Sequence, residues 1–398
     1  MNGIRQLPIT ELARLAMALT AAVLTACASD APPGSAPPPP IDEPAVNDDD
    51  PAWDVLEQRV VDYNHALRTS SLKLVLALPT LEQVRKVELA PDPRAAYEEE
   101  LDAMFVDARF RRRMLKFWRD TMRQGGGAAE DRPSRDTAPA FAARIVVEER
   151  RYSELFTAST NNCPGYDEAT DTFVDGECDN SAPIQAGVLT NTGTMHHLYG
   201  HMALHRVRWL QEVFVCGAFP AEQSESPIKI NDKAYASPWP ISSLATAPIN
   251  FQDTTNTAIC ASCHGTMHHI APLFAYFDAM GQWQPSIQVY TPATEVYPTA
   301  PTIMSDWLAD GETTAWRFGQ PVADLAELGR TLAEDPAVAR CAVARSWNFV
   351  MSKEDIVIDQ ATVPDEVLAP YVEAYHDSGE NLRSVLRTMF TSDDFVRR

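Results

Sequence analysis

Apolar side chains recur at helical spacing along most of this 398-residue chain. Spacings of three and four residues predict amphipathic helices, because one face of a helix repeats every 3.6 residues. No stretch alternates between apolar and polar residues as a half-buried strand would. The pattern therefore predicts an all-α fold, with helices over residues 53–67, two between 94 and 122, and others over 141–156, 195–214, 320–344 and 363–395.

Two segments lack this helical pattern. Residues 226–257 carry four prolines without helical periodicity, which predicts a loop. Residues 27–51 are rich in proline and aspartate and cannot bury enough apolar surface to fold. We expect residues 27–51 to form a disordered tether.

The amino terminus has the layout of a secretory signal. Arg5 and Arg14 precede an apolar run over residues 15–24, which is shorter than the roughly 20 residues needed to span a bilayer. The following Leu-Thr-Ala-Cys resembles a bacterial lipobox. We therefore interpret residues 1–26 as a lipoprotein signal peptide and Cys27 as the lipidated residue.

This interpretation predicts a protein of the bacterial cell envelope, exported from the cytoplasm and held at the membrane only through its lipid. Ala28 follows the lipid cysteine where inner-membrane retention would favour aspartate, so we prefer the outer membrane. The formal net charge of −22 argues against nucleic acid and anionic membrane surfaces as partners.

The strongest chemical motif is Cys260-Ala261-Ser262-Cys263-His264. The pattern C-x-x-C-H attaches one haem c covalently, with Cys260 and Cys263 on the porphyrin vinyl groups and His264 as the proximal iron ligand. A structural zinc site would need two more well-spaced ligands. A redox dithiol would follow a βαβ pattern, and none is visible nearby. Covalent haem attachment takes place outside the cytoplasmic membrane, in agreement with the signal sequence.

The sixth iron ligand has several candidates. Met304, in a proline-containing loop, is our tentative distal ligand, and Met280 is a weaker one because it lies nearer the motif. His268 and His269 follow the motif too closely to reach the far face of the ring, and we expect them at its proximal edge.

A polar stripe is a further candidate. On a helix over residues 195–214, one face would carry His197, His201, His205, Arg208 and Glu212. Two histidines one turn apart can bind a metal, and any one of them could ligate haem iron. We favour the simpler interpretation, a solvated polar face.

Four of the seven cysteines remain after the lipid and haem positions are assigned. Cys163 and Cys178 bracket a polar insert, and a disulfide bond there would stabilise by roughly 3 kcal/mol. Cys216 and Cys341 could form a second bridge by elimination, or they could be two buried free thiols.

The residues after the motif carry a resemblance. Ile270-Ala271-Pro272-Leu273 and the stretch from Tyr276 to Trp283 resemble the I-D-P-L-G and N-F-D-x-I-G-x-W segments of the planctomycete-type cytochrome c lipoproteins. Weaker similarity extends over most of the body. Ala271 replaces the aspartate of that family, and Val207 replaces the glycine of its H-R-G segment. The resemblance implies an exported, haem-bearing protein that exchanges electrons with another exported redox protein.

The expected architecture is a multi-helix body with a small cytochrome c-like haem module. We divide it into a helical domain over residues 52–240, the haem module over 241–319 and a second helical domain over 320–398. The leading hypothesis is electron transfer in the cell envelope. Two alternatives are a peroxidase-like or oxidase-like haem enzyme with an open or exchangeable sixth position, and an envelope scaffold with structural haem.

Overall fold

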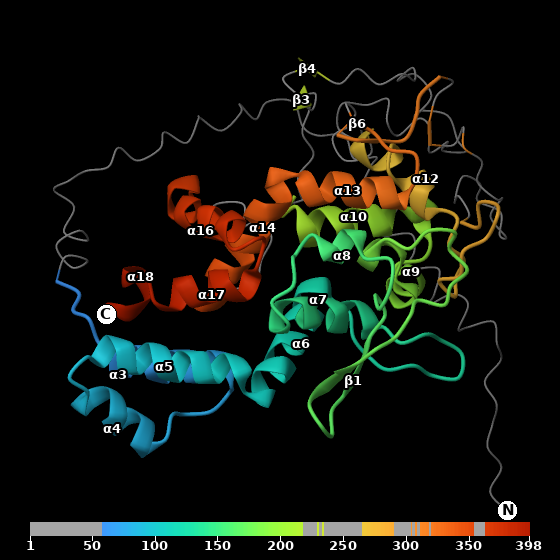
Figure 1. Cartoon of the computed structure of the whole chain (residues 1–398). Helices are drawn as coiled ribbons and strands as arrows, with labels where there is room; N and C mark the ends of the chain where they lie inside the picture. Colours follow the sequence, from blue (N-terminus) through green and yellow to red (C-terminus); the bar gives the residue numbers. More distant parts are fainter. Residues whose placement is uncertain are drawn as a thin grey trace, which may run out of the picture. The chain divides into compact units, whose positions relative to one another are not determined.

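The structure is a computed structural model of the chain (Figure 1). Residues from Arg59 to Arg398 form one compact unit. The structure describes residues 58–217, 229–230, 233–234, 265–289, 304, 307–308, 311–317, 320–353 and 363–398. The expected signal peptide and tether, Cys27, and the motif residues Cys260, Cys263 and His264 lie outside the described residues. The described part is mostly helical, in agreement with the predicted all-α class.

The first helices are α3 (Tyr63–Leu74), α4 (Leu81–Leu89), α5 (Pro93–Val106), α6 (Ala108–Met122) and α7 (Thr137–Val147). The two helices predicted between 94 and 122 are confirmed as α5 and α6. They separate at Asp107, whose carboxylate accepts a hydrogen bond from the Arg109 N–H. α4 was not predicted, because Val87 is its one buried residue and Leu81 and Leu89 are exposed.

Next along the chain are α8 (Glu154–Thr157), the 3₁₀ turns η2 (Gly187–Thr190) and η3 (His201–Ala203), and the helices α9 (Thr192–His197) and α10 (Leu204–Phe214). The single helices predicted over 141–156 and 195–214 are therefore wrong. The first stops at Val147, before Glu149 at φ +57°, and the second is broken by Met202 and Ala203 at φ +53° and +60°. A helix cannot continue through left-handed backbone.

Three short antiparallel strand pairs contradict the expectation that strands are absent. They are β1 (Gly165–Asp167) with β2 (Thr172–Val174), β3 (Lys229–Ile230) with β4 (Lys233–Ala234), and β5 (Ala315–Trp316) with β6 (Gln320–Pro321). Strands of two or three residues are too short to show alternation. β1 and β2 form a hairpin inside the polar insert, and β3 and β4 fall in the predicted loop. Pro321 lies within the helical stretch predicted over residues 320–344, but it ends β6, and the first helix there, α13, begins only at Leu325.

The carboxy-terminal elements are α12 (Ala271–Phe274), α13 (Leu325–Glu334), α14 (Pro336–Val350), α16 (Asp365–Asp377), α17 (Leu382–Phe390) and α18 (Asp393–Val396). α14 packs on α16 and α17, and α10 packs on α6, α12 and α14 (Figure 1). One hydrophobic core cluster includes residues from α3 through α18. The division at residues 240 and 319 stays a prediction.

Covalent and backbone links close this unit. Disulfide bonds join Cys163 to Cys178, with the Cα atoms 5.0 Å apart, and Cys216 to Cys341, with the Cα atoms 5.4 Å apart. The second bond ties the end of α10 to α14. Val60 and Arg398 exchange backbone hydrogen bonds of 3.0 and 3.1 Å. Among the described residues, no helix combines the length and apolarity needed to cross a membrane.

Candidate functional site

The described chain resumes directly after the predicted haem motif, at Gly265. Residues 265–268 form a helical turn. The Nδ1 atom of His269 lies 2.8 Å from the Gly265 carbonyl oxygen, so this nitrogen carries a proton and donates. Its Nε2 atom lies 3.5 Å from a carboxylate oxygen of Glu312. His268 is completely buried and His269 is 6% exposed, which places both side chains inside the protein.

Arg206 of α10 holds the segment that follows the motif. Its side chain is completely buried. Nη1 donates to the carbonyl oxygens of Phe274 at 2.5 Å and Phe277 at 3.2 Å, and Nη2 donates to that of Met195 at 2.5 Å. Burial lowers the pKa of Arg206 to about 9, so the guanidinium remains charged at neutral pH. One buried cation therefore connects α9, α10 and α12.

The stretch from Phe277 to Trp283 forms a turn centred on Asp278. One oxygen of its carboxylate accepts the N–H groups of Met280 at 2.8 Å and Gln282 at 2.9 Å. Gly281 has φ +73°, and a Cβ atom there would lie 2.2 Å from the Thr192 carbonyl oxygen at the start of α9. Glycine is required at this contact. Asp278 and Gly281, which match the aspartate and glycine of the N-F-D-x-I-G-x-W segment, therefore have a local structural role.

The tentative distal ligand lies on the surface of the described chain. The side chain of Met304 is 41% exposed, and that of Met280 is 43% exposed. His264 lies outside the described residues, so no distance joins either sulfur atom to the proximal ligand. Ligation by Met304 stays a prediction.

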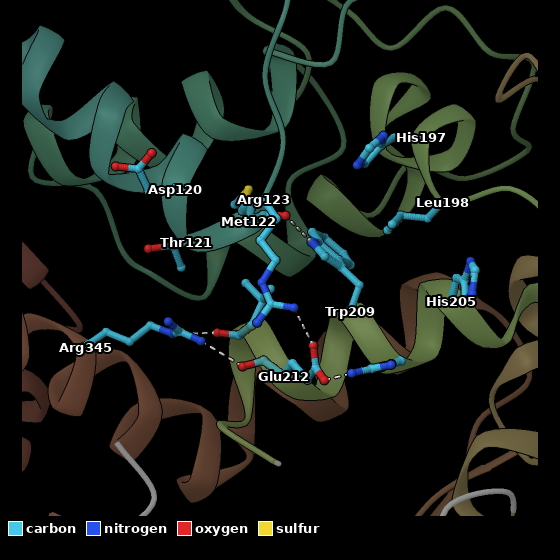
Figure 2. Close-up of a pocket in the computed structure, with 12 residues that line it drawn as sticks. Asp120, Thr121, Met122, Arg123, His197, Leu198, His205, Trp209, Glu212 and Arg345 are labelled. Carbon is cyan, nitrogen blue, oxygen red and sulfur yellow. Dashed lines mark hydrogen bonds and ion pairs between the residues drawn. The ribbon is translucent and has the colours of Figure 1, made fainter. Parts of the chain in front are cut away.

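A cavity of about 220 Å³ opens between the carboxy-terminal end of α6, α9 and α10 (Figure 2). On one side, Glu212 accepts from Arg123 Nη1 at 3.1 Å and from Arg208 Nε at 2.8 Å. Arg345 of α14 donates to the backbone carbonyl oxygens of Glu212 and Val213 at 2.7 and 2.9 Å. The full lining is Asp120, Thr121, Met122, Arg123, His197, Leu198, His205, Arg208, Trp209, Glu212, Val213 and Arg345.

The cavity gathers most of the predicted polar stripe, although the expected continuous helix is broken. His197, His205, Arg208 and Glu212 all line it. The first three are exposed, but Glu212 is 8% exposed, so the interpretation as a solvated face is wrong for that residue. Its burial has a physical reason, since two arginines bind its carboxylate.

His197 has a perturbed titration despite its exposed position. Surrounding atoms shield part of the ring, and this burial, followed by the charge of Arg135, lowers the pKa of His197. The ring is therefore neutral at pH 7. Among the described residues, no group of three or more His, Cys, Asp or Glu side chains is arranged to hold a metal ion.

Two arginines of the cavity, Arg123 and Arg345, were not predicted from the sequence. Both come from helices distant in sequence from α10. Arg123 caps α6 in the left-handed conformation, at φ +53°, just before Gly125-Gly126-Gly127. That glycine run signals the end of α6 but gives no indication of what the preceding arginine contacts.

Residues 185–286 match the family model PSCyt3, a protein of unknown function (DUF1588). PSCyt3 is a domain associated with planctomycete cytochromes. The matched stretch contains α9, α10, the C-x-x-C-H motif and the turn at Asp278. No curated protein and no solved structure matches the chain. The similarity to complete cytochrome c lipoproteins stays a prediction.

Proposed function

We propose that this chain is a lipid-anchored c-type cytochrome that carries one covalent haem and transfers electrons in the bacterial cell envelope. The observation that carries the proposal is the C-x-x-C-H motif ending at His264, inside the stretch that the PSCyt3 model matches. A haem of this kind supplies a one-electron iron couple. The partner would be another exported redox protein.

The donor set suits this group. Two thiols and one imidazole at this spacing are the side chains that covalent haem attachment requires. Beside the buried His268 and His269, the described residues that follow include buried apolar ones: Met267 is 6% exposed, and Ile270 and Phe274 are completely buried. These apolar side chains would offer the low-polarity surroundings that a porphyrin needs, and Arg206 binds the backbone carbonyl oxygen of Phe274.

The orientation of His264 has a candidate support in Pro272. The Pro272 carbonyl oxygen accepts the N–H of Ala275 at 3.2 Å within α12. A carbonyl oxygen has two lone pairs, so it can also accept the ring N–H of a proximal histidine. Such a bond fixes the ligand's tautomer and direction.

The disulfide bonds support an exported protein. Disulfides form and persist in oxidising compartments and are rare in the cytosol. The Cys163–Cys178 and Cys216–Cys341 bonds therefore agree with the signal-like amino terminus. The two bonds use the four cysteines other than Cys27, Cys260 and Cys263.

The decisive experiment measures covalent haem. The chain is expressed with a cytochrome c maturation system, denatured, and assayed as its pyridine haemochrome. We expect about one haem per chain, and none in the Cys260→Ser, Cys263→Ser double variant. Ser262→Ala is the matched control, because it changes the motif without removing a ligand, and it should keep the haem. A wild-type chain without haem under these conditions would overturn the proposal.

Spectra of the same preparation test the sixth ligand and the function together. Met304→Ala should remove the sulfur-to-iron charge-transfer band, whereas Met280→Ala, which truncates an equally exposed methionine, should keep it. A low-spin spectrum insensitive to peroxide supports electron transfer. A high-spin ferric spectrum with peroxide-driven turnover would contradict electron transfer as the function and support a haem enzyme instead.

A further inference from the structure

The cavity beside α10 has an apolar wall. Met122, Leu198, Trp209 and Val213 contribute it from three different elements. Trp209 is 5% exposed, and its indole N–H donates to the Met122 carbonyl oxygen at 3.2 Å. Figure 2 shows this bond, with His197 and His205 on the same side of the cavity as the indole. The indole is thus held in place and can pack against a ligand.

Cationic side chains surround that wall. Three arginines line the cavity against two carboxylates, while the ring of His197 contributes no charge at pH 7. Of the two carboxylates, Asp120 pairs with Lys116, outside the cavity lining, at 2.9 Å. Glu212 is shared by Arg123 and Arg208. One carboxylate between two guanidinium groups leaves an excess of positive charge at this place, although the whole chain carries −22.

The guanidinium of Arg123 reaches into water. Its side chain is 67% exposed, and Nη1 contacts Glu212 at 3.1 Å. A guanidinium has five N–H donors arranged in a planar fork that matches a carboxylate. Arg123 can therefore keep its bond to Glu212 and bind a second anion at the cavity mouth.

We propose that this cavity binds a small organic anion, a carboxylate whose apolar body is no larger than a single aromatic ring. The carboxylate would meet Arg123 beside Arg208, and the body would lie on Trp209. A volume of about 220 Å³ is below the range of pockets for drug-sized ligands, which limits the size of the body. This inference goes beyond the proposed electron transfer and does not depend on haem.

The rest of α6 favours a small ligand over a polyanion. Arg112 binds Asp171 through two nitrogens at 2.9 and 2.8 Å, and Arg119 binds Asp136 in the same way at 2.8 and 2.9 Å. These carboxylates neutralise Arg112 and Arg119, and Asp107 neutralises Arg109 in the same way. Much of the positive charge of α6 is therefore already paired, which favours a small anion at the cavity over a polyanion along the helix.

Isothermal titration calorimetry on the full chain tests the proposal with three probes: benzoate, benzyl alcohol and inorganic phosphate. We expect binding of benzoate and at least tenfold weaker binding of the other two, because each lacks either the charge or the apolar body. Arg123→Gln should weaken benzoate about tenfold or more. Arg112→Gln is the control, since its side chain is 58% exposed on the same helix and paired with Asp171. It should leave the affinity unchanged.

Each alternative result overturns the proposal. If benzoate does not bind, or if Arg123→Gln binds it as tightly as the unmodified chain does, the cavity is not the proposed carboxylate site. Equal affinity for phosphate would show that the cavity does not recognise an apolar body. Equal affinity for benzyl alcohol would show that it does not recognise a negative charge. Leu198→Phe fills the cavity without changing charge and should also abolish binding, with circular dichroism confirming that the variant is folded.

Discussion

Two arginines on α10, two positions apart, are used in opposite ways. Arg206 is completely buried and donates to backbone carbonyl oxygens, those of Met195, Phe274 and Phe277. Arg208 is 54% exposed and shares the Glu212 carboxylate with another arginine. The first faces the segment after the C-x-x-C-H motif, and the second faces the cavity.

The comparison shows that the contribution of an arginine to stability depends on whether its side chain is buried or exposed. A buried cation must be satisfied by many hydrogen bonds, so removing it leaves several carbonyl groups without partners. Loss of the exposed Arg208 should cost little, because water solvates its charge well and Arg123 remains to pair with the buried Glu212 carboxylate. The Arg206 side of α10 is therefore structural, while the cavity side keeps charge accessible to a solute.

The largest expected effect comes from exchanging these two arginines for methionine. Arg206→Met should lower the free energy of unfolding by about 3–5 kcal/mol, because it leaves buried carbonyl groups without a hydrogen-bond donor. Arg208→Met, the control, should cost less than about 1 kcal/mol. Urea denaturation followed by far-ultraviolet circular dichroism measures both. Similar losses of unfolding free energy in the two variants would contradict the view that Arg206 is structural and Arg208 is not.

A smaller effect should come from the glycine that seats the Asp278 turn on α9. Gly281→Ala should destabilise by about 2–3 kcal/mol, because its Cβ would meet the Thr192 carbonyl oxygen at 2.2 Å and its φ is +73°. Gly379→Ala is matched in backbone, with φ +70°, but has no atom within 4 Å. It should cost about 1 kcal/mol. Equal thermal shifts would show that backbone strain alone matters.

The smallest effect concerns pH on the cavity side. Burial lowers the pKa of His197 in the folded state, so below its ordinary value of about 6.5 the unfolded chain binds more protons. Stability therefore falls as pH decreases below that value. His197→Gln should show a shallower fall between pH 7.5 and 5, measured by denaturant unfolding. An unchanged slope would contradict the shielding of this ring.

Sequence periodicity predicted the elements that are long and locally specified. α5 and α6 follow from dense apolar spacing on either side of Asp107, which caps the second helix. The break between α9 and α10 was missed because it depends on left-handed backbone at Met202 and Ala203. Neither residue type favours that conformation, so the surrounding packing imposes it.

The cavity was not predicted as a site. The stripe from His197 to Glu212 was recognised but interpreted as a solvated face, and four of its members line the cavity. Arg123 and Arg345 join them from α6 and α14, and nothing local to either helix specifies that meeting. The burial of Arg206 was equally invisible, because its partners are backbone carbonyl oxygens that any sequence would supply.

The backbone pairing of Val60 with Arg398 has a practical consequence for engineering. Because the two ends of the compact unit are hydrogen-bonded neighbours, a short linker could join them and new termini could be opened elsewhere. Gly127, with open space around it, lies in the connection between α6 and α7. A circularly permuted chain opened there would cut none of the described helices, and the backbone would no longer join the residues around Arg123 to α7.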